Sequence, residues 1–209
     1  KSYIENGYYH LLNRGVEKRP IFTDQQDYKT FLYFLKRYLS NPDSLDVRVR
    51  PVRKVDLSQE IQLLAYCLMP NHFHLLVKQA SKNAITRITR HLNTSYVGYF
   101  NKRHQRAGGL FQGKLKGILV DTEPYLLYLT AYIHRNPQEI WKKSLVQYPY
   151  SSYAEYLVLR HTTWIQPQEI LSFFRSPRNL NRRDYLSYES FVENLKQDLS
   201  EILEDFALD

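Results

Sequence analysis

The chain has 209 residues, of which 43% are hydrophobic, which is typical of one well-packed domain or of one domain with a helical extension. Its single cysteine, Cys67, excludes an intrachain disulfide and a thiolate-built zinc site, and the lack of a long apolar run or signal-peptide core predicts a cytoplasmic protein without a membrane span. Lys and Arg number 29 against 21 Asp and Glu, and the net charge of +8 favours a polyanionic partner.

Strand and helix signals alternate in the first part of the chain. An aromatic and apolar run over residues 8–14 predicts a strand. Asp24 is a suitable N-cap for a helix over 24–39, in which apolar side chains recur at helical spacing. The segment 42–58 mixes Pro, Asp and Ser with basic residues and keeps no helical period, which predicts a basic loop or short irregular strands.

Two apolar runs, 61–68 and 72–77, flank the turn 69–71 and predict a central antiparallel hairpin. An amphipathic helix with a basic polar side follows over 84–104. Residues 110–121 then predict the last strand of the sheet, with lysines at alternate positions.

A further helix is predicted from Thr122 or Asp121 as N-cap, with Pro124 in its first turn, to Pro137. The order strand, helix, strand, strand, helix, strand is the ferredoxin-like pattern. We therefore predict an α+β fold with an antiparallel sheet, two helices on one face, and the added helix completing a domain over 1–137. Residues 138–209 predict a helical C-terminal extension that ends in an acidic amphipathic helix over 187–209.

One pair of histidines has the spacing of a metal site. Side chains on a strand alternate between its faces, so His72 and His74 project from one side while Phe73 points into the core. Two neutral imidazoles can hold a divalent ion and leave positions for water or substrate oxygens, as metal-assisted phosphoryl chemistry requires. A His-x-His pair is also common on ordinary surface sheets, so its sequence context decides.

The run over 65–77, with Met69-Pro70-Asn71 before His72-Phe73-His74, resembles the signature of REP-associated tyrosine transposases, members of the His-hydrophobic-His superfamily of single-strand nucleases. Further matches follow in order over about residues 8 to 156: Tyr9-His10 with Asn13-Arg14-Gly15, Ile21-Phe22 through Tyr28 and Phe31, Gly109-Leu110-Phe111-Gln112-Gly113-Lys114, Pro124-Tyr125-Leu126-Leu127 to Asn136-Pro137, and Tyr148-Pro149-Tyr150-Ser151-Ser152-Tyr153. The resemblance implies a transposase that cuts and joins single-stranded or hairpin DNA through a 5′-phosphotyrosine intermediate. It leaves open whether the protein acts as a monomer or a homodimer.

The resemblance also implies that Tyr125 is the nucleophile and that His72 and His74 hold Mg²⁺ or Mn²⁺. The chain has 18 tyrosines, so motif position and not abundance selects Tyr125, and Tyr128 on the same helix is its best rival. Related insertion-sequence transposases place a metal-binding Gln four residues after the tyrosine, where this chain has Leu129. The third ligand is then water, a DNA phosphate, or one of His10, Asn13, Gln112 and Asn136.

Basic residues bracket these motifs and predict phosphate contacts from Arg14, Arg48, Arg50, Arg53, Lys54, Arg87, Arg90, Lys114 and Lys116. Two other functions stay open: a metal-dependent nuclease that uses activated water, and a domesticated, non-catalytic DNA-binding protein. A covalent protein-DNA adduct that is lost in Tyr125→Phe would distinguish the transposase from the water-using nuclease. We further hypothesise that the acidic helix over 187–209 shields the basic surface.

Overall fold

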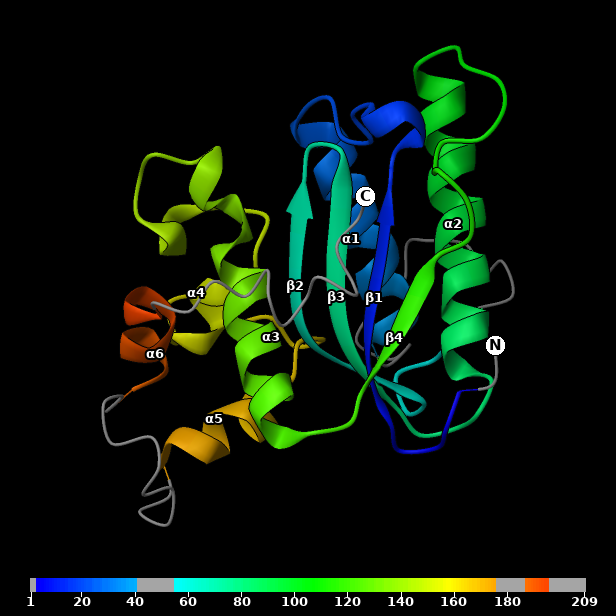
Figure 1. The fold of residues 1–209 in the computed structure, drawn as a ribbon. Coiled ribbons are helices and arrows are strands. Elements are labelled where there is room, and N and C mark those ends of the chain that lie inside the picture. The colour runs from blue at the N-terminus through cyan, green and yellow to red at the C-terminus, as the bar shows by residue number, and fades with distance from the viewer. Residues whose placement is uncertain (1–2, 41–54, 176–186, 196–209) are drawn as a thin grey trace.

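Four antiparallel strands form the centre of the molecule in the order β2-β3-β1-β4 (Figure 1). The computed structural model describes residues 3–40, 55–175 and 187–195. The strands are β1 (Tyr8–Arg14), β2 (Ile61–Met69), β3 (His72–Gln79) and β4 (Lys116–Val120). This order confirms the ferredoxin-like pattern. The predicted central place of the hairpin is wrong for β2, because β1 pairs with β3 and leaves β2 at one side of the sheet.

The strand β4 is shorter than the run over 110–121 suggested. Its pairing with β1 begins at Lys116, and upstream a single bridge joins Phe111 to Gly15. Gly113, at φ 128°, adopts a backbone conformation that residues with a Cβ rarely take, and so interrupts the extended path. Lys114 therefore precedes the strand, and the alternation of lysines is not a property of one strand.

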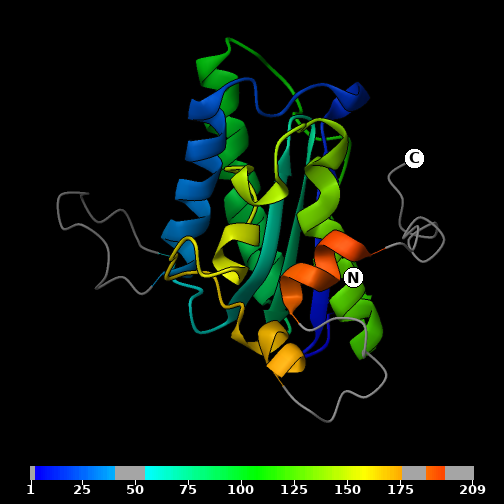
Figure 2. The same cartoon turned by 90° about the vertical axis from the view of Figure 1, so that its left-hand side faces the viewer.

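Helices cover both faces of this sheet (Figures 1 and 2). The helices α1 (Gln25–Leu39) and α2 (Ala84–Arg103) pack on one face, as predicted, and α3 (Glu123–Arg135) and α6 (Tyr188–Asn194) lie on the other. Because helices lie on both sides, nearly all of β3 is buried. Its Phe73 belongs to the core beneath α1 and α2, and its Leu76 to the core beneath α3.

Side-chain caps explain where two of the helices begin. The Asp24 carboxylate accepts hydrogen bonds from the backbone N–H groups of Gln26 and Asp27, and α1 starts at the next residue. The Thr122 hydroxyl accepts from the N–H of Tyr125 at 3.4 Å, and α3 follows it. The sequence predicted Asp24 as the first cap and Thr122 or Asp121 as the second, and the structure has Thr122 in that position.

The segment after residue 137 covers the outer side of β2. The N–H of Leu68 donates to the carbonyl of Tyr150 at 2.9 Å, and that of Ser152 donates to the carbonyl of Tyr66 at 3.0 Å. An exposed strand edge invites pairing with other chains, and this segment covers the edge instead. From Asn136 onward the chain also forms two 3-10 helices and two α-helices: η3 (Asn136–Glu139), η4 (Leu145–Gln147), α4 (Tyr153–Tyr156) and α5 (Gln168–Arg175). Another 3-10 helix, η1 (Val16–Lys18), follows β1.

Two of the predicted regions lie partly or wholly outside the described residues. The helix α6 is the described part of the predicted acidic segment 187–209, whose remainder, 196–209, is not described. The basic loop with Arg48, Arg50, Arg53 and Lys54 also lies outside the described residues. Within the described part of the chain, no helix combines the length and the apolar character needed to cross a membrane.

Candidate active site

The two histidines of β3 face the α3 side of the sheet. Their rings meet edge to face with centroids 4.9 Å apart, while Phe73 between them packs on Phe31 and Phe111 in the opposite core. The alternation of faces predicted from the His-Phe-His pattern is therefore present. His74 is 3% exposed, and His72, beside the turn to β2, is partly exposed. One imidazole thus lies at the surface and the other beneath it.

The carboxamide of Asn136 lies against both imidazoles. Its Oδ1 is 3.1 Å from Nε2 of His72, and its Nδ2 is 3.4 Å from Nε2 of His74. Asn136 directly follows the last residue of α3, so the end of this helix stands over the start of β3. Of the third ligands considered from sequence, Asn136 is the one that contacts both histidines.

Tyr132 lies one turn before Asn136 on the same side of α3. Its ring stands edge-on to the imidazole of His74, with centroids 5.5 Å apart. Burial raises the pKa of the Tyr132 phenol, and a hydrogen bond with Asn136 acts in the opposite direction. The phenol, the amide and the two imidazoles therefore form one cluster.

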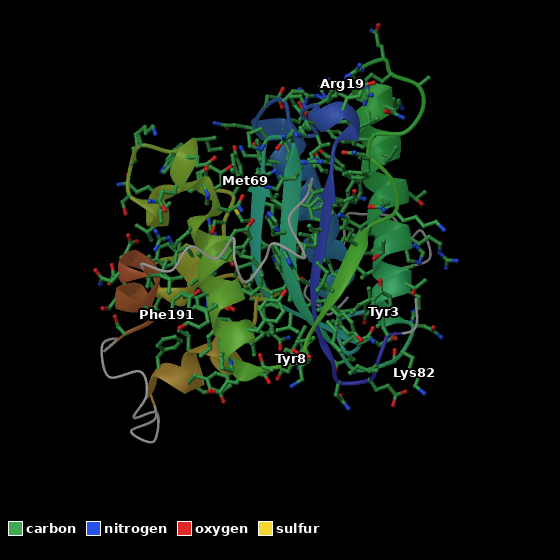
Figure 3. All side chains as sticks on the ribbon, in the orientation of Figure 1. Tyr3, Tyr8, Arg19, Met69, Lys82 and Phe191 are labelled. Carbon is green, nitrogen blue, oxygen red and sulfur yellow. The ribbon has the colours of Figure 1, made fainter. Side chains whose placement is uncertain are left out.

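The structure does not bring Tyr125 to this cluster. Tyr125 is in the first turn of α3, and at about 1.5 Å per residue it lies roughly 10 Å along the axis from Tyr132 and roughly 16 Å from Asn136. Strand register gives the same answer, because α3 follows Val120, which pairs with Tyr8, whereas His72 pairs with Arg14 at the other end of β1. In Figure 3, Tyr8 and Met69, the register partner of His72, mark these two ends.

Tyr125 and Tyr128, the two tyrosines that the sequence offered as nucleophile, both pack against apolar side chains. Burial, with a contribution from Asp121, raises the pKa of Tyr125 to about 12, and the ring packs in the core beneath α3. Tyr128 turns toward α6, where its ring packs on Phe191 with centroids 5.7 Å apart. The tyrosine that the fold places at the histidines is thus Tyr132, two turns further along the helix than Tyr125, the nucleophile that the resemblance implied.

Other predicted ligands occupy the neighbourhood of the cluster. Nε2 of His10, on β1, is 2.8 Å from Nδ1 of His74, so His10 contacts a histidine of the pair and not the space between them. Gln112 accepts from the Arg14 guanidinium at 3.3 and 3.4 Å. The Asn13 amide donates to the carbonyl of Gly113 at 3.3 Å, and its Oδ1 accepts from the N–H of Arg14.

The pKa values of both site histidines are shifted so that neutral imidazole is favoured. Burial lowers the pKa of His74 well below its ordinary value, with further lowering by His10 and His72. Burial also lowers the pKa of His72, although its hydrogen bond with Asn136 opposes the shift and nearby Arg14 adds to it. Neutral imidazole is the form that binds metal ions.

Hydrogen-bond geometry tests whether the cluster fits a divalent ion. The amide nitrogen of Asn71 donates to the carbonyl of Lys18, so Asn71 presents its oxygen to Nδ1 of His72, which must carry the proton. The lone pair on Nε2 of His72 then faces the Oδ1 lone pair of Asn136 at 3.1 Å. A cation between them relieves this repulsion, and two ligands at right angles, each about 2.1 Å from an ion, lie about 3.0 Å apart.

The donor set has an unusual third member. Among the described residues, no group of three or more His, Cys, Asp or Glu side chains gathers where it could hold a metal. The cluster that fits an ion therefore consists of two imidazoles and one amide oxygen, with the remaining positions open to water or a substrate oxygen. An apolar residue at position 129, one turn after Tyr125, lies in the core beneath α3 and plays no part in it.

The predicted basic residues divide into paired and exposed ones. Arg14 is 8% exposed and lies next to His72 across the β1–β3 pair. Arg87 forms an ion pair with Glu60. Arg90, Lys114 and Lys116 are exposed. Arg14 thus places a buried cation near the cluster, Lys114 and Lys116 present exposed cations just before and at the start of β4, and Arg87 is held by a carboxylate.

Known proteins are similar to this chain in sequence and in fold. Residues 3–136 match the family model described as "Transposase IS200 like". A solved structure of a REP-associated tyrosine transposase bound to a REP hairpin has 13% identity and a TM-score of 0.54, covering 79% of this chain and 94% of that one, and so shows a shared fold. A second, a candidate transposase from Deinococcus radiodurans R1, has 15% identity and a TM-score of 0.40, covering 65% of this chain and 94% of that one. No curated protein sequence matches significantly.

Proposed function

Since this chain belongs to the family of IS200-like transposases, we propose that it cuts and rejoins single-stranded DNA through a tyrosine nucleophile and a divalent metal ion. The nucleophile is Tyr132. His72, His74 and Asn136 would hold the ion, Mg²⁺ or Mn²⁺, which would supply positive charge to a phosphate of the DNA. The activity resembles that of REP-associated tyrosine transposases.

The observation that supports this proposal is the meeting of Tyr132 and Asn136 with the imidazole pair at the end of α3. The two residues are four apart, the same spacing that separates the tyrosine from its Gln ligand in related insertion-sequence transposases. Asn136 therefore fills the role that seemed missing at Leu129. An Asn amide is one methylene shorter than Gln, and it offers the same oxygen donor.

The chain's own residues account for most steps of the proposed reaction. When bound, the ion supplies positive charge that favours phenolate and polarises the scissile phosphate. The Tyr132 phenol loses its proton to water and its oxygen forms a bond to phosphorus. The bond from phosphorus to the 3′ oxygen breaks, and that oxygen takes up a proton to become a 3′ hydroxyl. One phosphodiester replaces another, so the later rejoining step needs no ATP.

The surroundings of the cluster suit an anionic substrate. The Arg14 guanidinium lies beside His72 and is oriented by Gln112, a position from which it can donate to the same phosphate. Because the REP-associated transposase of similar fold is bound to a REP hairpin, we infer a hairpin-forming repeat with adjoining single strand as the substrate of this chain. Exposed Lys114 and Lys116 on β4 and the loop before it supply further phosphate contacts.

A strand-labelling experiment tests this function. The full chain is incubated with Mn²⁺ and single-stranded hairpin DNA that is labelled at its 3′ end, and the products are separated on a denaturing gel. We expect a slowly migrating adduct, because the fragment that keeps the 5′ phosphate stays attached to the protein. Tyr132→Phe should abolish the adduct, while the matched controls Tyr125→Phe and Tyr128→Phe should retain it.

The other outcomes identify the competing functions. Cleavage without an adduct, unchanged in Tyr132→Phe, would show that activated water is the nucleophile. Binding of the hairpin with neither adduct nor cleavage would identify a non-catalytic DNA-binding protein. An adduct that disappears in Tyr125→Phe and persists in Tyr132→Phe would overturn the assignment of the nucleophile made from the geometry.

A further inference from the structure

A third histidine lies behind the proposed metal ligands. His10 is 2% exposed, and its Nε2 is 2.8 Å from Nδ1 of His74; the centroids of the two rings are 5.0 Å apart and the rings lie at an interplanar angle of 20°. The other nitrogen of His10, Nδ1, is buried and has no hydrogen-bond partner among the described residues. A buried polar atom without a partner destabilises a fold, so its presence calls for a reason.

One proton lies between the two rings, and its position decides what His74 can do. If His10 donated it, His74 would carry its own proton on Nε2 and could not offer that nitrogen to an ion. If His74 donates it, Nε2 of His74 has a free lone pair. The amide nitrogen of Asn136 points at this Nε2 from 3.4 Å, and an amide nitrogen is a donor, so it faces a lone pair.

We propose that His10 is a positioning residue that accepts the Nδ1–H of His74 and so holds His74 in the tautomer that leaves Nε2 unprotonated and able to bind an ion. The inference rests on the proposed function, because it requires that His74 binds a metal. With His74 as donor, the proton of neutral His10 lies on its Nδ1, the atom that lacks a partner among the described residues. The unfavourable burial of that atom is thus a consequence of the same arrangement.

The chemical type of this acceptor matters for a DNA substrate. Histidines that bind metals usually donate their other N–H to a carboxylate, a carbonyl or water. A carboxylate at this position would add negative charge beneath a site that must receive a phosphate. The neutral imidazole of His10 fixes the tautomer of His74 and adds no such charge, so the positive charge of the ion stays available to the DNA.

Two substitutions distinguish the role of His10 as a hydrogen-bond acceptor from its role in filling space. His10→Gln keeps an oxygen that can accept the N–H of His74, whereas His10→Leu fills the space without an acceptor. We expect His10→Leu to weaken Mn²⁺ binding about 10–100-fold, the usual effect of removing such a partner, and His10→Gln to remain within a few-fold of the parent chain. His10→Leu also leaves the buried Nδ1–H of His74 without an acceptor, so the metal-free variant should melt at a lower temperature than the parent chain, whereas His10→Gln should melt close to it.

The affinity for Mn²⁺ and the tautomer of His74 can both be measured directly, without DNA. Mn²⁺ is titrated into the full chain and both variants by calorimetry, and long-range ¹H–¹⁵N spectra of the metal-free parent chain identify the protonated nitrogen of His74. We expect Nδ1 to be protonated. Protonation on Nε2, or equal Mn²⁺ affinity of the parent chain and His10→Leu, would overturn the role of His10 and leave the proposed function intact. Failure of the parent chain to bind Mn²⁺ would overturn the proposed function itself.

Discussion

Buried His134 makes the stability of this protein sensitive to acid. Its ring lies between the last turn of α3 and the C-terminal segment, with Nδ1 2.7 Å from the Tyr188 hydroxyl and Nε2 2.8 Å from that of Ser152. Burial lowers the pKa of His134 from 6.5 to about 3. The folded protein therefore holds the ring neutral at pH values where the unfolded chain protonates it.

The size of the effect follows from the difference between the two pKa values. As pH falls below about 6.5, the unfolded state gains protonation free energy that the folded state does not share until pH approaches about 3. For one such group the stabilisation of the unfolded state grows by about 2 kcal/mol between pH 7 and pH 5. Native domains have total stabilities of about 5–15 kcal/mol, so the loss should be easy to measure.

The perturbation is His134→Gln, and the assay is urea unfolding followed by circular dichroism at pH 7 and pH 5 in metal-free buffer. Gln does not titrate, so the variant should lose about 2 kcal/mol less than the parent chain between the two pH values. At pH 7 it should be about 1–3 kcal/mol less stable, because buried partners lose good geometry. Equal losses in the two proteins would refute the claim that His134 is buried and neutral.

Three further results are expected from the described contacts. Arg14→Gln should slow single-turnover DNA cleavage about 10²–10³-fold, as when one donor to a developing oxyanion is removed. Replacing Lys114 and Lys116 by Gln should reduce the salt slope of single-strand binding by about 1.4, or about 0.7 for each lost phosphate contact. Asp27→Ala should lower the free energy of unfolding by about 3–5 kcal/mol, measured in urea, because its fully buried carboxylate is paired with Arg103.

Each of these results has a matched control. Lys29→Gln removes an exposed cation from α1, on the face of the sheet opposite α3, and should leave the cleavage rate unchanged; an equal loss there would make the effect of Arg14 one of general charge. A salt slope that the lysine substitutions leave unchanged would exclude the edge beside β4 as a DNA contact. Asp24→Ala, which removes the more exposed partner of Arg103, should destabilise less than Asp27→Ala, and the reverse order would contradict the burial argument.

Periodicity and capping were sufficient to predict most of the fold. The spacing of apolar residues located α1 and α2, and Asp24 and Thr122 marked the starts of α1 and α3. The hairpin itself was predictable, because two apolar runs flank a short turn. Its place at one side of the sheet was not, since nothing within 61–77 shows that β1 pairs with β3 and leaves β2 outside.

The histidine pair could be predicted from sequence, and the tyrosine could not be chosen by helical geometry alone. Tyr125 and Tyr132 are seven residues apart, close to two full turns, so both project from nearly the same side of α3. The two tyrosines differ in their position along the axis of α3. That position is fixed by the register in which β4, just before α3, pairs with β1. The spacing of Tyr132 to Asn136 was a usable signal in the sequence, since it repeats the tyrosine-to-amide spacing that is absent after Tyr125.

The last turn of α3 links the proposed chemistry to the C-terminal part of the chain. Tyr132 and Asn136 face the imidazoles, while Arg135 on the other side donates to carbonyls at the end of α6, including that of Val192 at 3.1 Å. The same turn is joined to β2 through His134 and Ser152. Nε2 of His134 is 2.8 Å from the Ser152 hydroxyl, which accepts from the N–H of Tyr66 on β2 at 2.8 Å. Residues beyond 137 therefore pack against the helix from the side opposite the imidazoles, so the position of Tyr132, the proposed nucleophile, depends on packing that a chain ending at 137 would lack.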